Sequence, residues 1–316
     1  MARVLTFGEP MGLMVATEPK ALKDVTTFHR YVCGAEVNFS VGMSRLGHDM
    51  SYISRVGNDP FGQHILDFLK EQHINTDYVT LDEVNRTGMQ LKAKTLEGDP
   101  EVVNFRRFTA FSYMEPAIVD TVAWDKYDHL HVTGIPAALS DSCRETSIAM
   151  MKAAKAHGGQ VSFDTNLRPA LWPSEEAMRE TINYLASLAD IVLPGFGEGK
   201  ILTGFDTPEA IADFYLKQGA KAVVIKLGTK GSFVKTEAEA FYAPAYVVEQ
   251  VVDTVGAGDG FAVGTISGRL EGLSWADSVR RGAAIVARQV QVEGDNEGLP
   301  TPEQLATYQK SAKLSE

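Results

Sequence analysis

The sequence predicts an α/β fold with a doubly wound, mostly parallel sheet that carries helices on both faces. From residue 128 onward, short β-branched runs alternate with stretches of helical periodicity. Strands that alternate with helices imply a parallel sheet, because each helix returns the chain to the same end of the sheet. The chain has 316 residues, and 44% of them are hydrophobic, so a large core can be buried.

The N-terminal part predicts strands and helices in alternation. A helix is expected to begin just after Gly34, and Gly47 ends it, because glycine is favoured where a helix terminates. The run Gly57 to Gly62 contains Pro60 and predicts a turn into a second helix. The remaining elements expected here are strands at 3–8, 13–17 and 50–56 and a helix at 63–72.

A small flap interrupts this rhythm. Residues 87–95 and 102–108 read as two short strands, and Glu97-Gly98-Asp99-Pro100 between them is typical of a hairpin turn. We expect an antiparallel flap rather than more of the central sheet. No internal repeat or low-complexity linker is present, which favours one domain over 1–316 with a lid formed by about 10–33 and 87–112.

The C-terminal half supplies the other strands and helices. Ser274 and Asp277 have the spacing of a capping box and predict a helix start. The expected strands are 128–133, 160–163, 191–193 and 222–227, and the expected helices are 141–157, 175–188, 208–218, 274–292 and a surface helix from Pro302.

Composition excludes several classes of function. A net charge of −11 and a pI near 5.2 argue against a general affinity for nucleic acid or an anionic membrane. Only Cys33 and Cys143 occur, so no disulfide framework is predicted and a reducing compartment is favoured. We see no signal peptide and no run of eighteen apolar residues, and therefore expect a cytoplasmic protein.

The stretch from Asp253 to Gly264 carries the chemistry. Gly256, Ala257 and Gly258 lie where a loop becomes a helix, so their backbone N–H groups lack intrahelical partners and can hold an anion. Asp259 would repel a bound phosphate unless it accepts a proton from the group that attacks that phosphate. The alternative is that Asp259 caps the helix and the glycines only permit close packing.

The pattern Asp-Thr-x-Gly-Ala-Gly-Asp-x-Phe that begins at Asp253 resembles the signature of the ribokinase-like (PfkB-type) sugar kinases. The resemblance implies a ribokinase-like fold and phosphoryl transfer from ATP with Mg²⁺, and it leaves a monovalent cation open. It makes Asp259 the base, and it makes the backbone of Gly256, Ala257 and Gly258 the holder of charge on the γ-phosphoryl group.

Two further segments resemble sites of this family. Gly34 and Asn38 fall in Gly-Ala-Glu-Val-Asn, where the family places sugar contacts; the alternative is that they only start and pack a helix. Lys226 to Gly231 leaves a strand into a glycine-rich turn and resembles the nucleotide loop; alternatively it is a plain hairpin turn. The resemblance implies nucleotide contacts at Asn166, Lys226, Gly228, Thr229, Gly231, Thr254, Gly256 and Gly258.

Arg168 and Glu198 are candidate ligands for anion and metal. Arg168 precedes a proline and can pair with a carboxylate or a phosphate; the alternative is a solvated surface arginine. Glu198 occupies the place of the glutamate in the family's Asn-x-x-Glu motif, while Gly195 replaces the asparagine. Contact with Mg²⁺ through water is therefore the role expected for Glu198.

The flap segment from Asn104 to Ala110 resembles the aromatic-Arg-Lys-x-Ser-Ala segment of 2-keto-3-deoxygluconate kinases. It departs from that pattern at Arg107 and Thr109, and Gln90 stands where a tyrosine is expected. The run from Gly294 to Pro300 also resembles this subgroup. The substrate contacts implied are Gly34, Asn38, Gln90, Phe105, Arg106, Arg168 and Asp259.

The expected function is ATP-dependent phosphorylation of a primary hydroxyl on an acidic sugar, with 2-keto-3-deoxygluconate as first choice. A fructokinase or ribokinase-like kinase of a neutral sugar is the nearer alternative, and a non-catalytic sugar-binding regulator is the distant one. We expect no nucleic-acid or membrane partner. Val102, Val103 and Phe105 form an edge that natural proteins usually cover, so we also expect a homo-oligomer through the lid.

Overall fold

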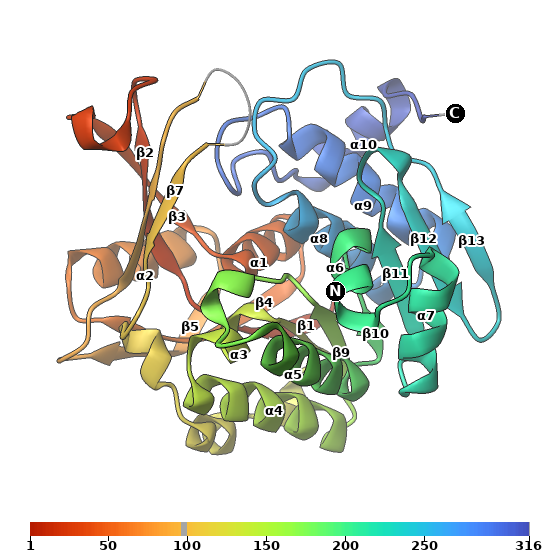
Figure 1. Cartoon of the computed structure of the whole chain (residues 1–316), viewed down its shortest axis with the longest axis horizontal. Helices are drawn as coiled ribbons and strands as arrows, with labels where there is room; N and C mark the ends of the chain where they lie inside the picture. The colour runs from red at the N-terminus through yellow and green to blue at the C-terminus, as the bar shows by residue number, and fades with distance from the viewer. Residues whose placement is uncertain (96–99, 316) are drawn as a thin grey trace.

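A computed structural model describes residues 1–95 and 100–315 and arranges them as a large and a small sheet with helices around them (Figure 1). The large sheet has the strand order β13-β12-β11-β10-β9-β8-β1-β4-β5. Its strands are β1 (Arg3–Phe7), β4 (Asp49–Gly57), β5 (Asn75–Asp82), β8 (His129–Thr133), β9 (Gln160–Asp164), β10 (Ile191–Val192), β11 (Ala222–Lys226), β12 (Ser232–Thr236) and β13 (Ala240–Ala243).

Pairing in the large sheet is parallel from β5 across to β11 and antiparallel through β12 and β13. The parallel strands read as continuous apolar runs because helices cover both of their faces. The predicted class, a mostly parallel doubly wound sheet with a small second sheet, is confirmed.

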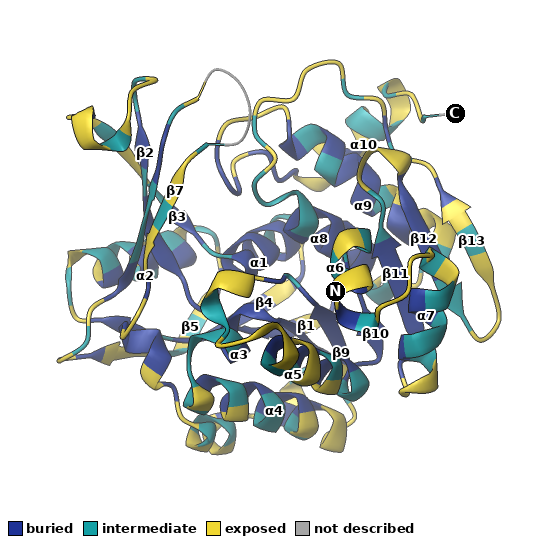
Figure 2. Cartoon of the chain, viewed as in Figure 1, coloured by how far each residue is buried: buried dark blue, intermediate teal, exposed yellow. Residues whose placement is uncertain are grey.

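Two helical layers bury the two faces of the large sheet. Val4 and Val224 point into one core and Leu5 and Val223 into the other, as alternation along a strand requires. One layer holds α1 (Ala35–Arg45), α2 (Pro60–Glu71), α8 (Ala257–Leu270), α9 (Trp275–Gln289) and α10 (Pro302–Ser311). The other holds α4 (Asp141–Ala156), α5 (Glu175–Leu188), α6 (Phe196–Thr203) and α7 (Pro208–Lys217). Figure 2 shows the buried central strands and the exposed outer surfaces of α4 and α5.

The small sheet has the order β3-β2-β6-β7, with β2 (Met11–Ala16), β3 (Phe28–Cys33), β6 (Gly88–Lys92) and β7 (Val102–Phe105). β2–β3 and β6–β7 are antiparallel, but the central pair β2–β6 is parallel. The predicted antiparallel flap of two strands is confirmed in β6 and β7, and the parallel pairing of β6 with β2 extends it into a four-stranded sheet. The long connection through α1, β4, α2 and β5 allows the parallel pairing. Residues 97–99 of the predicted hairpin turn lie outside the described residues.

Helix α8 packs against α9 with almost no side chain between them. A Cβ on Gly264 would lie 2.5 Å from the Cα of Gly282, and a Cβ on Gly268 would lie 2.7 Å from Ser278 Oγ. Close backbone contact of this kind leaves α8 little freedom to shift or rotate. Within residues 1–95 and 100–315, none of the helices combines the length and the apolar character that crossing a membrane requires.

Candidate active site

Three elements meet at a cavity of about 450 Å³ at the carboxyl edge of the large sheet. Asp164 ends β9, Lys226 ends β11, and Gly256 precedes the first turn of α8. Pro100 and Val102 bring the lid to the same cavity. Ligands collect at this edge in open α/β sheets, so the location alone marks a candidate site.

Asp259 stands at the third position of α8, and its side chain is almost completely buried. The side-chain amide of Asn38 donates to Asp259 Oδ2 at 2.8 Å, and that of Asn166 donates to Oδ1 at 3.3 Å. Because each carboxylate oxygen is held by a different element, the side chain is fixed in orientation. It does not act as the cap of its own helix, since Gly256 occupies the N-cap position.

The pKa of Asp259 is raised to about 7, mainly by burial. The Asn38 amide and the charges of Lys226 and Arg168 favour the ionised form, whereas the Asp164 carboxylate disfavours it. A carboxyl with a pKa near the working pH suits a general base.

Lys226 supplies a fixed positive charge beside Asp259. Its Nζ donates to both carboxylate oxygens of Asp164, at 2.6 and 2.8 Å. Burial lowers the pKa of Lys226, but the carboxylates of Asp164 and Glu198 raise it by more, so the side chain stays charged. The ammonium lies 3.4 Å from where a Cβ on Gly258 would stand. It therefore lies against the loop of Gly256, Ala257 and Gly258, which we call the anion loop.

The anion loop requires glycine at Gly256. Its φ is 76°, and a Cβ there would lie 2.5 Å from both Asp295 O and Gln289 Nε2. The N–H groups of Gly258 and Asp259, in the first turn of α8, have no intrahelical acceptor available. The structure therefore forms the helix N-terminus that the sequence predicted, with Thr254 at the rim of the cavity.

Glu198 is already committed to hydrogen bonds. Its Oε1 accepts from Leu167 N at 2.7 Å, and its Oε2 accepts from Thr165 Oγ1 and Gly195 N, each at 2.7 Å. Burial raises the pKa of Glu198, but Lys226 and these donors outweigh it, so the pKa is lowered and the group is ionised. Glu198 fixes the loop after β9, and its charge still faces the cavity.

Magnesium fits this site only together with a phosphate ligand. No group of three or more His, Cys, Asp or Glu side chains able to hold a metal ion occurs in 1–95 and 100–315. The cavity nevertheless presents three carboxylates, Asp164, Glu198 and Asp259, against the cations Lys226 and Arg168. A polyphosphate entering an acidic cavity needs a divalent cation, and Mg²⁺ normally keeps waters and binds phosphate oxygens.

Asn166 and Arg168 follow β9 in a constrained loop. Asn166 has a positive φ of 37° and donates its backbone N–H to Asp164 Oδ1 at 3.2 Å, so its side chain reaches Asp259 rather than solvent. Arg168 is exposed, lines the cavity and donates to Leu167 O at 2.8 Å. Arg168 is thus available to an anionic ligand.

The predicted nucleotide loop divides into two parts. Lys226 lines the cavity, whereas Gly228 and Thr229 lie exposed in the single turn η6 (Gly228–Lys230). Gly231 has a packing role: a Cβ there would lie 2.0 Å from Ala243 O, so β13 can approach only a glycine. The structure does not bring Gly228, Thr229 and Gly231 to the cavity that contains Asp259.

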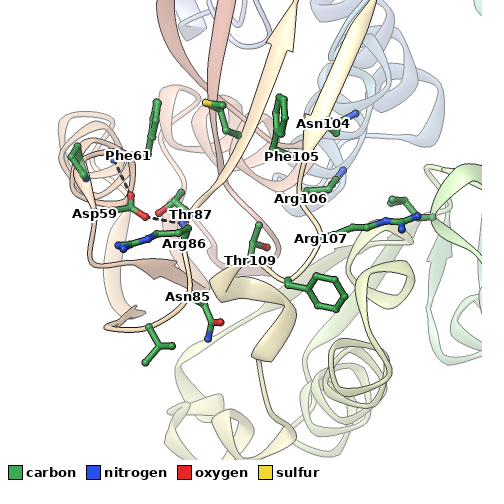
Figure 3. Close-up of a pocket in the computed structure, with 15 residues that line it drawn as sticks. Asp59, Phe61, Asn85, Arg86, Thr87, Asn104, Phe105, Arg106, Arg107 and Thr109 are labelled. Carbon is green, nitrogen blue, oxygen red and sulfur yellow. Dashed lines mark hydrogen bonds between the residues drawn. The ribbon is translucent and has the colours of Figure 1, made fainter.

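Gln90 and Phe105, both expected to contact the substrate, lie on opposite faces of the small sheet of the lid. Gln90 pairs with Asn104, and its Nε2 donates to Asn104 Oδ1 at 2.9 Å. Phe105 pairs with Met89, one position along, and so points to the opposite face of the small sheet. Phe105 is 52% exposed and lines a different cavity of about 950 Å³, with Phe61 of α2 (Figure 3). Phe105 stays a predicted substrate contact, on the face of the small sheet opposite to Gln90 and outside the lining of the cavity that contains Asp259.

Arg106 lies in the same 950 Å³ cavity and is buried by an acidic partner (Figure 3). Its Nη2 lies 2.6 Å from Glu9 Oε2, and Thr109 Oγ1 donates to Glu9 Oε1 at 2.7 Å. The two arginines expected in one pocket are thus apart, since Arg168 lines the cavity of Asp259. The charge of Arg106 is already balanced by Glu9.

Sequence reasoning missed several partners of the site. Asn296 donates to Asn38 Oδ1 at 3.3 Å and to Val32 O at 3.0 Å, linking the C-terminal loop to the base. Glu9, which follows the first strand, was missed as the partner of Arg106 and Thr109. Asp164 was identifiable, because a carboxylate that directly follows a buried strand lies at the ligand edge. Gly34 and Asn38 were placed correctly at the start of α1, and a Cβ on Gly34 would lie 2.7 Å from Glu9 O.

A helix N-terminus with free N–H groups, a buried carboxylate beside it and a lid that reaches the same cavity are features of a small-molecule phosphotransferase. The chain belongs to the pfkB family of carbohydrate kinases, which matches residues 1–302.

The chain is 48% identical over 306 residues to the 2-dehydro-3-deoxygluconokinase of Bacillus subtilis (strain 168), covering 96% of this chain and 94% of that protein. It also resembles two solved structures. The PfkB protein from Polaromonas sp. JS666 is 41% identical, with a TM-score of 0.89 over 97% of this chain and 99% of the other. A protein described as a ribokinase II from E. coli, in complex with ATP and Mg²⁺, is 26% identical, with a TM-score of 0.90 over 98% and 99%.

Proposed function

We propose that this carbohydrate kinase transfers the γ-phosphoryl group of ATP to a primary hydroxyl of an acidic sugar, with 2-keto-3-deoxygluconate as first choice. The observation that carries the proposal is Asp259, a buried carboxylate with a pKa of about 7 at the N-terminus of α8. A sugar hydroxyl beside Asp259 would lose its proton to the carboxylate as it attacks the phosphoryl group.

Other residues of the chain stabilise charge, orient Asp259 and exclude water. The N–H groups at the start of α8 and the ammonium of Lys226 stabilise charge on the phosphoryl oxygens. Glu198 would hold Mg²⁺ through water, and the bound ion would supply positive charge to the polyphosphate. Asn38 and Asn166 keep the Asp259 carboxylate aimed. The lid, about 10–33 and 87–112 within a single unit of 1–316, excludes water from the transfer.

Two observations support the proposal of an acidic substrate. Arg168 lines the cavity, and the relative from B. subtilis is a 2-dehydro-3-deoxygluconokinase. An acidic protein repels an anionic substrate unless a local cation reverses the potential, and Arg168 is an exposed cation at the cavity. A coupled assay of ADP release with ATP, Mg²⁺ and a panel of sugars and sugar acids tests this. Absence of sugar-dependent ADP release from every compound would refute the kinase proposal.

A neutral sugar is the second candidate, and one observation favours it. Arg106 is paired with buried Glu9, so the lid adds no net charge at that position. The same panel separates the two candidates, because fructose or ribose would then exceed 2-keto-3-deoxygluconate in kcat/KM. A non-catalytic regulator has no need of a fixed base, and ADP release excludes it.

We also propose that the chain forms a homo-oligomer through the lid. β7 is an edge strand, and Phe105 exposes half of its side chain on the outer face. Val102 faces the cavity of Asp259 instead, so Val103 and Phe105 carry the outer surface. A cytoplasmic location agrees with the two buried free cysteines and with ATP as donor. The dependence on a monovalent cation stays a prediction, tested by replacing K⁺ with tetramethylammonium at constant ionic strength.

A further inference from the structure

Lys92 is a buried lysine that the catalytic cavity does not use. It ends β6 of the lid, and its side chain is only 5% exposed. Its Nζ lies 2.5 Å from Asp253 Oδ2 and 3.9 Å from Asp295 Oδ1. Lys92 is absent from the lining of the cavity that contains Asp259, so it acts on that site only through its partners.

Both partners belong to segments that shape the anion loop. Asp253 Oδ1 accepts from Val255 N at 3.0 Å, which sets the turn that leads into Gly256. The backbone oxygen of Asp295 lies 2.5 Å from where a Cβ on Gly256 would stand. Asp295 Oδ1 is buried without a hydrogen-bond partner among the described residues. One ammonium therefore serves two buried carboxylates, one on each side of the loop.

Stability alone is a poor explanation for this arrangement. A buried ion pair is often no more stabilising than apolar side chains of the same volume, and here the second carboxylate, Asp295, lies too far from Lys92 for a hydrogen bond. The pair provides a link, because it joins β6 of the lid to Asp253 in the segment that leads into the anion loop. A positive charge at this place fixes Asp253 and, with it, the N–H groups that hold phosphate.

We propose that Lys92 is a positioning residue for phosphoryl transfer, which couples the sugar-binding lid to the anion loop through Asp253. The inference rests on the proposed kinase function and deepens it. A displaced anion loop impairs the holding of the ATP phosphates and the transfer itself, whereas binding of the sugar to Gly34 and Gln90 is untouched. Removing Lys92 should therefore lower kcat/KM for ATP and leave the KM for the sugar nearly unchanged, although the residue lies in the lid.

The chain offers a matched control in Lys94. Its Nζ lies 3.7 Å from Glu293 Oε2, so it also joins the lid to the C-terminal loop. The side chains of this pair are 39% and 48% exposed, and a solvated pair of this kind contributes little. Lys94→Ala should keep wild-type kinetics.

The test compares Lys92→Ala with Lys94→Ala and wild type, by steady-state kinetics and by titration calorimetry with ATP and Mg²⁺. For Lys92→Ala we expect kcat/KM for ATP to fall roughly 10- to 100-fold, as a misplaced group would cause, with the KM for the sugar within about threefold. Methylammonium or ethylammonium should restore part of the loss by filling the vacated site. Tetramethylammonium at the same ionic strength is too large to do so.

Each outcome decides the inference. Wild-type nucleotide kinetics in Lys92→Ala would overturn it, as would an equal loss for sugar and ATP without rescue by small amines. If the alanine variant does not fold, Lys92→Gln carries the same comparison, because glutamine keeps a donor but not the charge. A wild-type protein that releases no ADP would refute the kinase proposal instead, and calorimetry with ATP would still decide the role of Lys92.

Discussion

The side-chain amide of Asn38 donates to the Asp259 carboxylate at 2.8 Å across 221 residues of sequence. The contact joins the first turns of α1 and α8, two helices of one layer. It also links Asp259 to the C-terminal loop, since the side-chain amide of Asn296 donates to Asn38 Oδ1. The Asp259 carboxylate is thus oriented by distant segments of the chain, and variants of Asp259 test the proposal that it is the base.

Replacing Asp259 by asparagine should abolish most of the turnover. Asp259→Asn keeps the shape of the side chain but cannot accept a proton, so we expect kcat to fall roughly 10²- to 10⁴-fold. Binding of ATP should change little, as measured by calorimetry. Asp277→Asn is the control, because Asp277 occupies the same third position in α9 and is exposed. Retention of more than about a tenth of the rate in Asp259→Asn, with chemistry limiting, would exclude Asp259 as the base.

The rate should depend on pH through the same carboxyl. Because burial raises the pKa of Asp259 to about 7, kcat/KM for the sugar should fall about tenfold for each pH unit below 7 and level off above it. Rates from pH 5 to 9 at saturating ATP check this. A plateau extending down to pH 5 would show that a different group, with an ordinary carboxyl pKa, controls the reaction.

Loss of the base should stabilise the protein at high pH. Folding raises the pKa of Asp259 from 3.8, so the folded state binds the proton more tightly and wild type loses stability as the pH rises from about 4 to 7. The loss from this group is at most about 4 kcal/mol at pH 8. Asp259→Asn removes this loss, so the free energy of unfolding in urea should rise at pH 8 and should rise by less than half as much at pH 5. An equal difference at both pH values would contradict the raised pKa.

Arg168 should discriminate between acidic and neutral sugars. A charge-assisted hydrogen bond contributes about 1.5–3 kcal/mol, so Arg168→Gln should lower kcat/KM for 2-keto-3-deoxygluconate roughly 10- to 150-fold and for fructose much less. Arg179→Gln, on the exposed side of α5, is the control. Equal losses for both sugars, or a wild-type preference for fructose, would refute the acidic substrate.

The same experiment at Arg106 needs a second substitution. Arg106→Gln alone would leave the carboxylate of Glu9 buried and unpaired, and a loss of stability would obscure the kinetics. The variant Arg106→Gln with Glu9→Gln removes both charges. If Arg106 binds the substrate carboxylate when the lid closes, the double variant should lose acid substrate selectively; unchanged selectivity would confine Arg106 to structure.

Assembly through the lid can be tested at Phe105. Phe105→Ser removes the half-exposed aromatic side chain from the outer face of β7, and we expect it to shift a wild-type dimer toward monomer at micromolar concentration. Light scattering measures the mass. Tyr184→Ser, which removes an exposed aromatic from α5, should leave the mass unchanged. A monomeric wild type would exclude the proposed interface.

The large elements could be predicted because local patterns determine them. The helix after Gly34, the strand that ends at Lys226 and the loop before α8 were all recognisable from glycine placement and apolar periodicity. β5 was missed because most of its residues are exposed or half-buried and show no clear alternation. β12 and β13 were missed because the turn after Lys226 was assigned to nucleotide binding, whereas it is also the hairpin turn of an edge ribbon.

The candidate site was predictable in its residues and less so in their partners. Asp259, Lys226 and Arg168 do meet at one cavity. The pairing of Arg106 with Glu9 joins residues 97 apart, and nothing local signals such a contact. The place of Phe105 depends on register: its side chain alternates with that of Asn104 along β7, so the two face opposite sides of the small sheet.

The hydrogen bond between Gln90 and Asn104 bears on how this enzyme could be re-engineered. The base belongs to α8, which glycines hold tightly against α9, so changes there would damage catalysis for every sugar. Gln90 and Asn104 belong to a separate sheet, lie opposite each other on neighbouring strands and share a hydrogen bond. A library that varies these two positions jointly offers a route to new sugar preferences. The residues proposed to transfer the phosphoryl group would stay unchanged.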